Sequence, residues 1–498
     1  MNIPLFKPFA TQSQKARTIR QSRLILLVLC TLTSRVRGKL AAATSDSPLL
    51  SASDINADFQ HLAEQLSEIH PNLYIHRTPI EETRLRTSIE SQLNRPMDAV
   101  DFYQLVAEYT TFFQDGHTFP SMDFATRSYR ASLENNNTVL PIDVDLDRRG
   151  FYIKNIYETD SHPGIGARLL SVNGHSSREI ISAFQTYYAK PASLFDNAHA
   201  RLFKEYYWLA FGSSTHWQLR FQHEGREVNE TTLEGISMDT FQQRKMSQQS
   251  EKNVANQAMF RFHYLDNTPS IAVITIDAMG NFDLFERFLR ARFKEIEQRG
   301  IKHLVIDIRE NGGGSSRLGD ELFAYLHSDP YNEGSMQVKI SRAVQDWYRS
   351  KRQGHPLFDF VTQQQLGTLA RFPLPPAIPR KTDHPFEGQC YLLIGPKTYS
   401  SGHMLAGLIK CHAAGIVIGQ ETGQATKTPG DAFSFLLPKS QIGISVSYKL
   451  FEGPCEPSTT RGFTPHHFVT YSTDERRTQV DKEMNLVRQL AGQRVRID

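Results

Sequence analysis

An alternation of apolar runs and helical segments after residue 270 constrains the fold of this 498-residue chain more than any other feature. The runs are nearly continuous in Val, Ile and Leu, as is typical of strands buried on both faces. They cover residues 271–276, 303–308, 389–394 and 415–419. Residues 282–296 place apolar side chains at steps of three and four, and Gly300 ends the predicted helix. Strands that alternate with helices predict an α/β core with a mainly parallel, helix-covered sheet.

The chain before this core predicts smaller units. Residues 50–132 have helical spacing and carry a turn sequence, Asp115-Gly116-His117-Thr118. Residues 138–186 alternate apolar and polar side chains and include a tight-turn pair, Asn173-Gly174. We expect a PDZ-like β module there, whose sheet edge can take an extended peptide as an extra strand; a plain hairpin is the alternative. The other predicted units are a leader (1–44), a connecting region (187–256), the α/β domain (257–475) and a C-terminal helix (476–498).

The first 44 residues have the layout of a secretory signal. Basic residues between Lys15 and Arg23 precede an apolar run at 24–32, and alanines follow at 41–43. The run has roughly ten residues, whereas a bilayer-spanning helix needs about 20. Basic residues between the run and the alanines are atypical of a cleavage region. We therefore expect an exported protein, periplasmic or extracellular, with an uncleaved membrane-proximal anchor or a cytosolic chain as alternatives.

Charge and cysteine content exclude several classes of partner and cofactor. The formal net charge is +3 and no dense basic block lies beyond the N-terminus, so no nucleic-acid partner is expected. Without Cys30 three cysteines remain, an odd number that gives no clean disulfide framework. Cys390 and Cys411 lie in apolar segments and are interpreted as buried, whereas a disulfide at Cys455 is possible but unsupported. No residues have zinc-ligand spacing, and no metal or organic cofactor is expected.

Ser400 is the first residue that suggests chemistry. It follows the apolar run 389–394 and precedes the helical stretch 404–409. A serine at such a strand-to-helix turn exposes its hydroxyl at the sheet edge, where the N–H of Ser401 can help to hold an oxyanion. The alternative is a helix N-cap, which serine often provides.

A run of three glycines, Gly312 to Gly314, follows the strand at 303–308. Glycines allow the backbone to approach a bound group closely with its N–H donors free, so this loop suits an oxyanion hole. A phosphate cradle is disfavoured because no lysine follows and no Gly-x-Gly-x-x-Gly pattern is present. A tight turn without function is the third alternative.

His117 in the Asp115–Thr118 turn is the third feature. A serine nucleophile needs a base whose pKa is near the working pH, and histidine meets this need best. A loop histidine is more often only solvated, and sequence alone does not show whether it reaches Ser400.

Together these motifs resemble the tail-specific, or C-terminal-processing, protease family. Residues 304–314 resemble the glycine-rich signature of that family, and residues 395–402 with 416–423 resemble its nucleophile segment and next strand. The turn around His117 resembles the loop histidine of the tricorn-core branch. The resemblance covers about residues 55–470 and implies a ClpP/crotonase-like core.

The resemblance implies roles for individual residues. Ser400 is then the nucleophile, His117 the base, and the backbone of Gly313, Gly314 and Ser401 the oxyanion hole. Another branch of the family uses a lysine base, but the matching position is Ala425, two residues before Lys427. The carboxylate that orients the base matches Glu456 best, with Glu452 and Asp431 as alternatives. Four positions depart from the family pattern: Gly116, His403, Gln420 and His466.

The resemblance predicts a serine endopeptidase that cleaves extended or unfolded peptides through an acyl-enzyme. The departures favour an alternative, a catalytically impaired relative that binds peptides or apolar ligands. An esterase or amidase is a third possibility. An α/β-hydrolase triad of Ser400, Asp431 and His466 or His467 has the right order, but Thr398 breaks the Gly-x-Ser-x-Gly motif.

Overall fold

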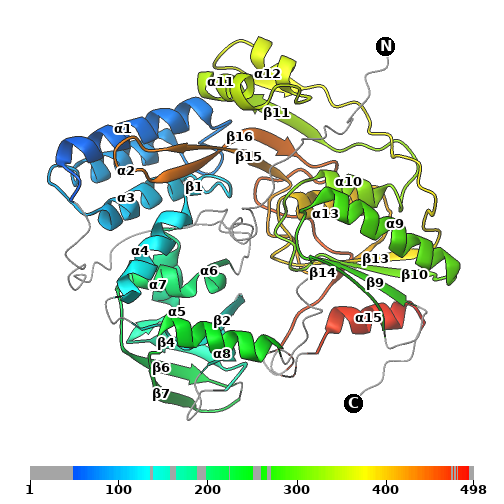
Figure 1. Ribbon diagram of the computed structural model, residues 1–498, viewed down its shortest axis with the longest axis horizontal. Helices are drawn as coiled ribbons and strands as arrows, with labels where there is room; N and C mark the ends of the chain where they lie inside the picture. Colours follow the sequence, from blue (N-terminus) through cyan, green and yellow to red (C-terminus); the bar gives the residue numbers. More distant parts are fainter. Residues whose placement is uncertain are drawn as a thin grey trace.

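The computed structural model describes residues 49–134, 138–147, 149–157, 164–187, 198–223, 225–250, 259–265, 271–472, 475, 478 and 480–492. The predicted leader, including Cys30, lies outside these residues. Figure 1 shows the N-terminal helices beside a long β hairpin, a β module next to them, and the α/β core on the opposite side of the molecule. No helix in the described part of the chain is long and apolar enough to cross a membrane.

The α/β core is a six-stranded sheet in the order β17-β14-β13-β10-β9-β8. Neighbouring strands are parallel except for β8, which pairs antiparallel with β9. The expected parallel core is thus confirmed as part of a mixed sheet. Its elements are β8 (Phe260–Tyr264), β9 (Ile271–Ile276), α9 (Phe282–Gln298), β10 (His303–Asp307), α10 (Arg317–Phe323), β13 (Gln389–Ile394), α13 (Ser401–Cys411), β14 (Ile416–Gly419), β17 (His467–Phe468) and α15 (Lys482–Leu490).

Alternate side chains of the core strands bury into two separate layers. Ile274 and Leu304 pack with residues of α9, α10 and α13, such as Phe285. Val273 and Val305 face the other side and share a cluster with Met484 and Val487 of α15. Burial on both faces explains why these strands are almost purely apolar.

The N-terminal helical domain forms from well-capped segments. The Ser51 hydroxyl accepts the Asp54 N–H at the start of α1, which ends before Pro71, and Thr78 forms a capping box with Glu81 on α2. Its elements are α1 (Ala52–Ile69), α2 (Pro79–Glu90), α3 (Ala99–Phe112), β1 (Phe119–Pro120) and α4 (Met122–Glu134).

The β module contains an antiparallel sheet in the order β2-β3-β4-β6-β7, with β5 on β4. Because β6 pairs with β4, the sheet continues past the boundary predicted at residue 186 and includes part of the predicted connecting region. Its elements are β2 (Ile142–Asp147), β3 (Gly150–Ile156), β4 (Arg168–Val172), β5 (His175–Ser176), α5 (Ser177–Phe184), α6 (Ala198–Arg201), α7 (Phe203–Phe211), β6 (His216–Gln222), β7 (Val228–Glu234) and α8 (Met238–Ser250).

A third, antiparallel sheet was not expected from the sequence. Its order is β1-β16-β11-β12, with β15 also paired to β16. The short strand β1 belongs to the helical domain, so this sheet joins the front of the chain to residues more than three hundred positions later. Its other elements are β11 (Ser335–Lys339), α11 (Arg342–Lys351), α12 (Phe358–Gln363), β12 (Leu369–Phe372), β15 (Lys427–Leu436) and β16 (Gly443–Glu452).

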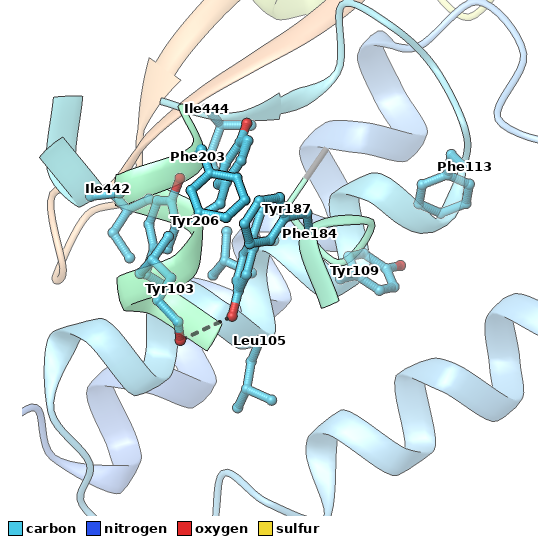
Figure 2. Packing of buried hydrophobic residues seen from close by; sticks show 14 of the residues in the cluster. Tyr103, Leu105, Tyr109, Phe113, Phe184, Tyr187, Phe203, Tyr206, Ile442 and Ile444 are labelled. Carbon is cyan, nitrogen blue, oxygen red and sulfur yellow. Dashed lines mark hydrogen bonds between the residues drawn. The ribbon is translucent and has the colours of Figure 1, made fainter. Parts of the chain in front are cut away.

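One continuous apolar cluster connects the helical domain, the β module and the third sheet. Figure 2 shows aromatic side chains such as Tyr103, Phe184 and Tyr206 gathered near Ile442 and Ile444. Burying a large apolar side chain stabilises a fold by roughly 1.5–3 kcal/mol, so this shared cluster holds the three units in a fixed arrangement.

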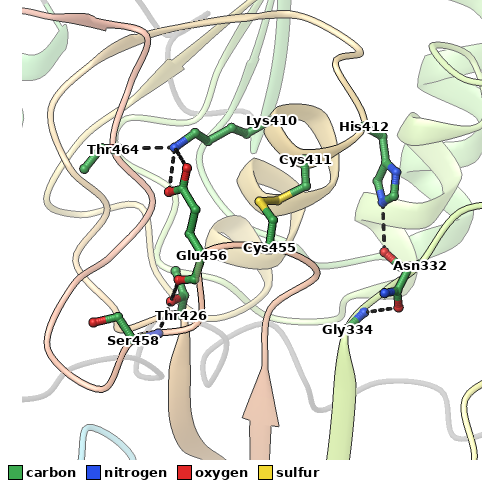
Figure 3. The surroundings of a disulfide bond; sticks show 10 residues. All are labelled: Asn332, Gly334, Lys410, Cys411, His412, Thr426, Cys455, Glu456, Ser458 and Thr464. Carbon is green, nitrogen blue, oxygen red and sulfur yellow. Dashed lines mark hydrogen bonds and ion pairs between the residues drawn. A yellow bond between two sulfur atoms is a disulfide. The ribbon is translucent and has the colours of Figure 1, made fainter.

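The cysteine interpretation needs one correction. Cys411, expected to be a buried free thiol, forms a disulfide with Cys455, and their Cα atoms are 5.8 Å apart (Figure 3). Cys390 is free and buried, as expected. The disulfide was missed because Cys411 ends an apolar helix and its partner lies 44 residues later, in a loop whose position depends on the third sheet.

Candidate active site

Ser400 lies in the turn between β13 and α13, in a strained backbone conformation. Its φ is 50° and its ψ is −123°, a region that residues other than glycine seldom occupy. It stands at the N-cap position of α13, yet its side chain makes no capping hydrogen bond. The simple capping role considered from the sequence is therefore absent, and strain of this kind concentrates at functional sites.

The glycine loop after β10 packs directly against this turn. A Cβ atom on Gly313 would lie 2.6 Å from the Cβ of Ser400 and 3.1 Å from the amide nitrogen of Ser401. Asn311 fixes the loop: its side-chain amide donates to the Ile276 carbonyl, and its own carbonyl accepts the Tyr399 N–H. Only glycine fits here, and Gly313 also has a φ of 104°.

The hydrogen bonds of the glycine loop indicate which backbone N–H groups could donate to an oxyanion. The Gly313 N–H donates to the side-chain oxygen of Asn311 at 2.9 Å and is therefore occupied. Among the described residues, no hydrogen bond occupies the N–H of Gly314 or that of Ser401. The Ser401 hydroxyl donates to the Gly314 carbonyl at 2.7 Å, which joins the two segments.

The loop of His117 is fixed to β16 by the pairing of β1. Ser445 of β16 donates its hydroxyl to the His117 carbonyl at 3.0 Å, and the Ser447 N–H donates to the Thr118 hydroxyl at 3.1 Å. The imidazole then lies against Tyr399, the residue before Ser400, with ring centroids 5.3 Å apart. The structure thus brings the predicted base to the turn that carries the predicted nucleophile.

A buried carboxylate, Asp115, organises the same loop. It accepts hydrogen bonds from the His117 N–H, the Thr118 hydroxyl and Nε2 of His70, at 3.0, 2.5 and 3.0 Å. Since Nδ1 of His70 accepts the Asn72 N–H, the ring proton is on Nε2. Both side chains of the His70–Asp115 pair are almost fully buried.

The electrostatics of Asp115 favour its ionised form. Burial alone would raise its pKa, but the hydrogen bond from His70 and the charge of His117 outweigh it, and the pKa lies well below its usual value. A permanent negative charge therefore lies close to the proposed base.

The structure does not bring the predicted acid to His117. The Glu456 carboxylate pairs with Lys410 at 2.8 Å, beside the disulfide (Figure 3). Cys455 is tied to Cys411 at the far end of α13 from Ser400, and an 11-residue helix is about 16 Å long. The assignment of Glu456 rested on its position in the sequence, which does not reveal this lysine.

Glu452 and Asp431, the alternative carboxylates, are also engaged elsewhere. Glu452 binds Lys427 at 3.2 Å, a hydrogen bond that lowers its pKa. Asp431 forms an ion pair with Lys449 and accepts the Tyr448 hydroxyl. Its neighbour Gly430 does approach the imidazole, since a Cβ atom on that glycine would lie 3.6 Å from Cε1 of His117.

The residues required by the lysine-base hypothesis and by the hydrolase-type triad also have other partners or lie elsewhere. Lys427, the alternative base, is held by Glu452. In the hydrolase-type triad, Nδ1 of His466 accepts the Val417 N–H at the sheet edge, and His467 is exposed on β17. Among the described residues, no group of three or more His, Cys, Asp or Glu side chains could hold a metal ion.

One residue of the site was missed by sequence reasoning. The side-chain oxygen of Gln424, in the loop between β14 and β15, accepts the N–H of Ser400 at 2.7 Å. Gln424 is 6% exposed. Its position next to Ala425, where a lysine base was sought, was the only sequence signal for it.

Known proteins resemble this chain in sequence and in fold. Residues 270–451 match peptidase family S41. Mature CPAF is 12% identical over 88% of this chain and 96% of its own, with a TM-score of 0.58, and its lactacystin complex gives the same score. A CPAF point mutant is 14% identical over 90% and 99% of the two chains, with a TM-score of 0.60. No curated protein sequence matches significantly. At these identities the structures show a shared fold, and the sequence match assigns residues 270–451, which include Ser400 and the glycine loop, to peptidase family S41, a family of serine protease hydrolases.

Proposed function

We propose that this chain is an endopeptidase that cleaves extended or unfolded peptides through an acyl-enzyme on Ser400. The observation that carries the proposal is the strained, uncapped Ser400 between the Gly313 loop and the ring pair of Tyr399 and His117. An N-cap serine with no function would relax to an ordinary conformation and cap its helix.

In the proposed mechanism His117 accepts the hydroxyl proton as the Ser400 oxygen attacks the peptide carbonyl. The amides of Gly314 and Ser401 stabilise the resulting oxyanion, since no acceptor in the described part of the chain occupies them. The protonated imidazole then gives its proton to the leaving amine, and water releases the acyl group with His117 as base again. Asp115, rather than Glu456, supplies the nearby negative charge that favours the imidazolium.

The β module is the observation that favours an extended peptide as the substrate. Within the described part of the chain its sheet ends in two edge strands, β2 and β7, whose backbone groups can pair with an added strand. A folded substrate would not expose such a strand, so we expect casein or another unfolded protein to be cleaved and compact globular proteins to resist.

A fluorophosphonate probe tests the proposal. We expect labelling of the native chain, loss of labelling in Ser400→Ala and strong slowing in His117→Ala. Ser350→Ala, at an exposed hydroxyl on α11, is the matched control and should label normally. Lactacystin, found in complex with CPAF, provides a second probe and should protect the native chain from labelling. Labelling that persists in Ser400→Ala would refute the assigned nucleophile.

A peptide-binding protein without catalysis is the second candidate. The pairing of Glu456 with Lys410 favours it, because the Ser–His pair then lacks the acid that the family resemblance implied. A native chain that binds casein-derived peptides but neither reacts with the probe nor cleaves them would establish this function. Faster turnover of nitrophenyl esters than of casein would instead indicate an esterase.

We also propose that the protein is exported. The Cys411–Cys455 disulfide supports this, since disulfides persist mainly in oxidising compartments. Residues 1–44 fused to a reporter enzyme should direct it out of the cytoplasm, and retention of the reporter inside would contradict the proposal.

A further inference from the structure

The backbone of Ser400 has the geometry of the first central residue of a type II′ turn, with φ 50° and ψ −123°. Glycine normally fills that position because a side chain there is strained. Such a conformation persists only where surrounding contacts over-determine it. The contacts that hold Ser400 in place are therefore part of the catalytic machinery if Ser400 is the nucleophile.

Three of the contacts that hold the turn involve Asn311, Gly313 and Gln424. The Tyr399 N–H donates to the Asn311 carbonyl at 3.0 Å, and Gly313 approaches Ser400 from the side of the glycine loop. The third contact is the only one made to the amide of Ser400 itself among the described residues: the side-chain oxygen of Gln424, at 2.7 Å. An N–H donor requires an acceptor, which fixes the orientation of the Gln424 amide.

Backbone hydrogen bonds on both sides of Gln424 fix its position. The Gly423 N–H donates to the Thr398 carbonyl at 3.1 Å, and the Thr426 N–H donates to the Arg461 carbonyl at 2.9 Å. A Cβ atom on Gly462 would lie 2.8 Å from the Gln424 carbonyl, so this segment packs tightly against the loop. The glutamine thus presents its oxygen from a rigid, buried position.

We propose that Gln424 is a positioning residue for catalysis, which holds the Ser400 amide so that the neighbouring Ser401 amide remains directed at the oxyanion. The two successive amides have different surroundings, because the Ser401 nitrogen faces the glycine loop while the Ser400 nitrogen faces Gln424. Without the glutamine oxygen, rotation of the Tyr399–Ser400 peptide relieves the strain and moves the hydroxyl away from the glycine loop. The inference rests on the proposed role of Ser400.

The test compares two variants of Gln424 with the native chain. Gln424→Met keeps the length of the side chain without its acceptor, and Gln424→Asn keeps an amide that is one methylene too short. We expect kcat to fall about 10- to 100-fold in both, as for displacements of about 1 Å at a reacting group, with KM changed less than about threefold. The rate of fluorophosphonate labelling should fall in parallel.

Gln420→Met is the matched control, since Gln420 lies at the start of the same loop and binds Ile394 through its backbone. It should keep native kcat. Native kcat in both Gln424 variants, or a rise in KM alone, would overturn the inference. Ser400→Ala separates the two hypotheses: if it abolishes turnover while the Gln424 variants remain active, only the positioning role fails. If Ser400→Ala remains active, the proposed function fails as well.

Discussion

Replacement of Gly313 by alanine tests the geometry of the site most directly. The new Cβ would lie 2.6 Å from the Cβ of Ser400, whereas ordinary contacts begin at 3.4 Å, so the two segments must separate by 3.4 − 2.6 = 0.8 Å. The backbone adds strain, because φ at Gly313 is 104° and a side chain in a left-handed conformation costs about 1–2 kcal/mol. The contact and the strain together predict a loss of about 2–4 kcal/mol in unfolding free energy.

The effect on catalysis should exceed the effect on stability. A displacement of about 1 Å at a reacting group lowers rates about 100-fold, so we expect kcat/KM of Gly313→Ala to fall by about that factor. The assay is casein or peptide hydrolysis at a temperature well below the melting point of the variant, which thermal unfolding establishes first.

Gly354→Ala is a control that separates the effect of backbone strain from the effect of close contact with Ser400. Gly354 has a φ of 78°, but a Cβ there meets no heavy atom within 4 Å. This variant should lose about 1–2 kcal/mol of stability and keep full activity. If Gly313→Ala retains kcat/KM within about threefold of the native value, the tight packing of the glycine loop against Ser400 has no catalytic consequence, and the reasoning is refuted.

Four further changes have defined outcomes. Asp115→Asn should lower the unfolding free energy by about 3 kcal/mol. The native pKa of Asp115 is held below its usual 3.8. The stability that its carboxylate contributes is therefore present above about pH 4 and is lost as the pH falls from there toward the native pKa. Urea titrations of the variant and the native chain should converge over that acid range. Cys411→Ser should destabilise by about 4 kcal/mol, the loop-closure value for a separation of 44 residues, and reducing agent should change the melting temperature of the native chain but not that of the variant. Asp320 has its pKa raised to about 7 by burial and by the charge of Glu333. The native chain should therefore lose stability as the pH rises from about 4 to 7. At pH 8 the Asp320→Asn variant should be more stable than the native chain by at most about 4 kcal/mol. Equal melting temperatures of the two chains at pH 8 would contradict this. Glu456→Gln should keep most activity and cost less than about 1 kcal/mol, since its ion pair is partly exposed, and a large drop in kcat would restore it as the acid.

The parts of the fold that follow local pattern were predictable from sequence. Continuous apolar runs indicated the parallel strands β9, β10, β13 and β14, because burial on both faces leaves a signal in every residue. The turn at Ser400 and the glycine loop were also located, since both directly follow such strands. Their positions at the carboxyl ends of neighbouring strands explain why they meet.

The third sheet and its consequences were not predictable in this way. The pairing of Phe119 with Ser445 depends on register between distant segments, and neither two-residue β1 nor its partner carries a local signal for it. The assignment of Glu456 as the acid was not supported for a related reason: the disulfide and Lys410 fix that loop away from the base. The role of Gln424 depends on one side-chain contact and has no sequence motif.

The strand pair β1–β16 also bears on the order in which the site is completed during synthesis. The turn with His117 leaves the ribosome early, whereas the backbone that fixes it, residues 443–452, appears much later. Residues 270–451 alone contain the serine and the glycine loop but not the histidine. If the proposed base is correct, a nascent or truncated chain is therefore inert, and the hydrolase cannot attack its neighbours until these two distant stretches of the polypeptide have docked.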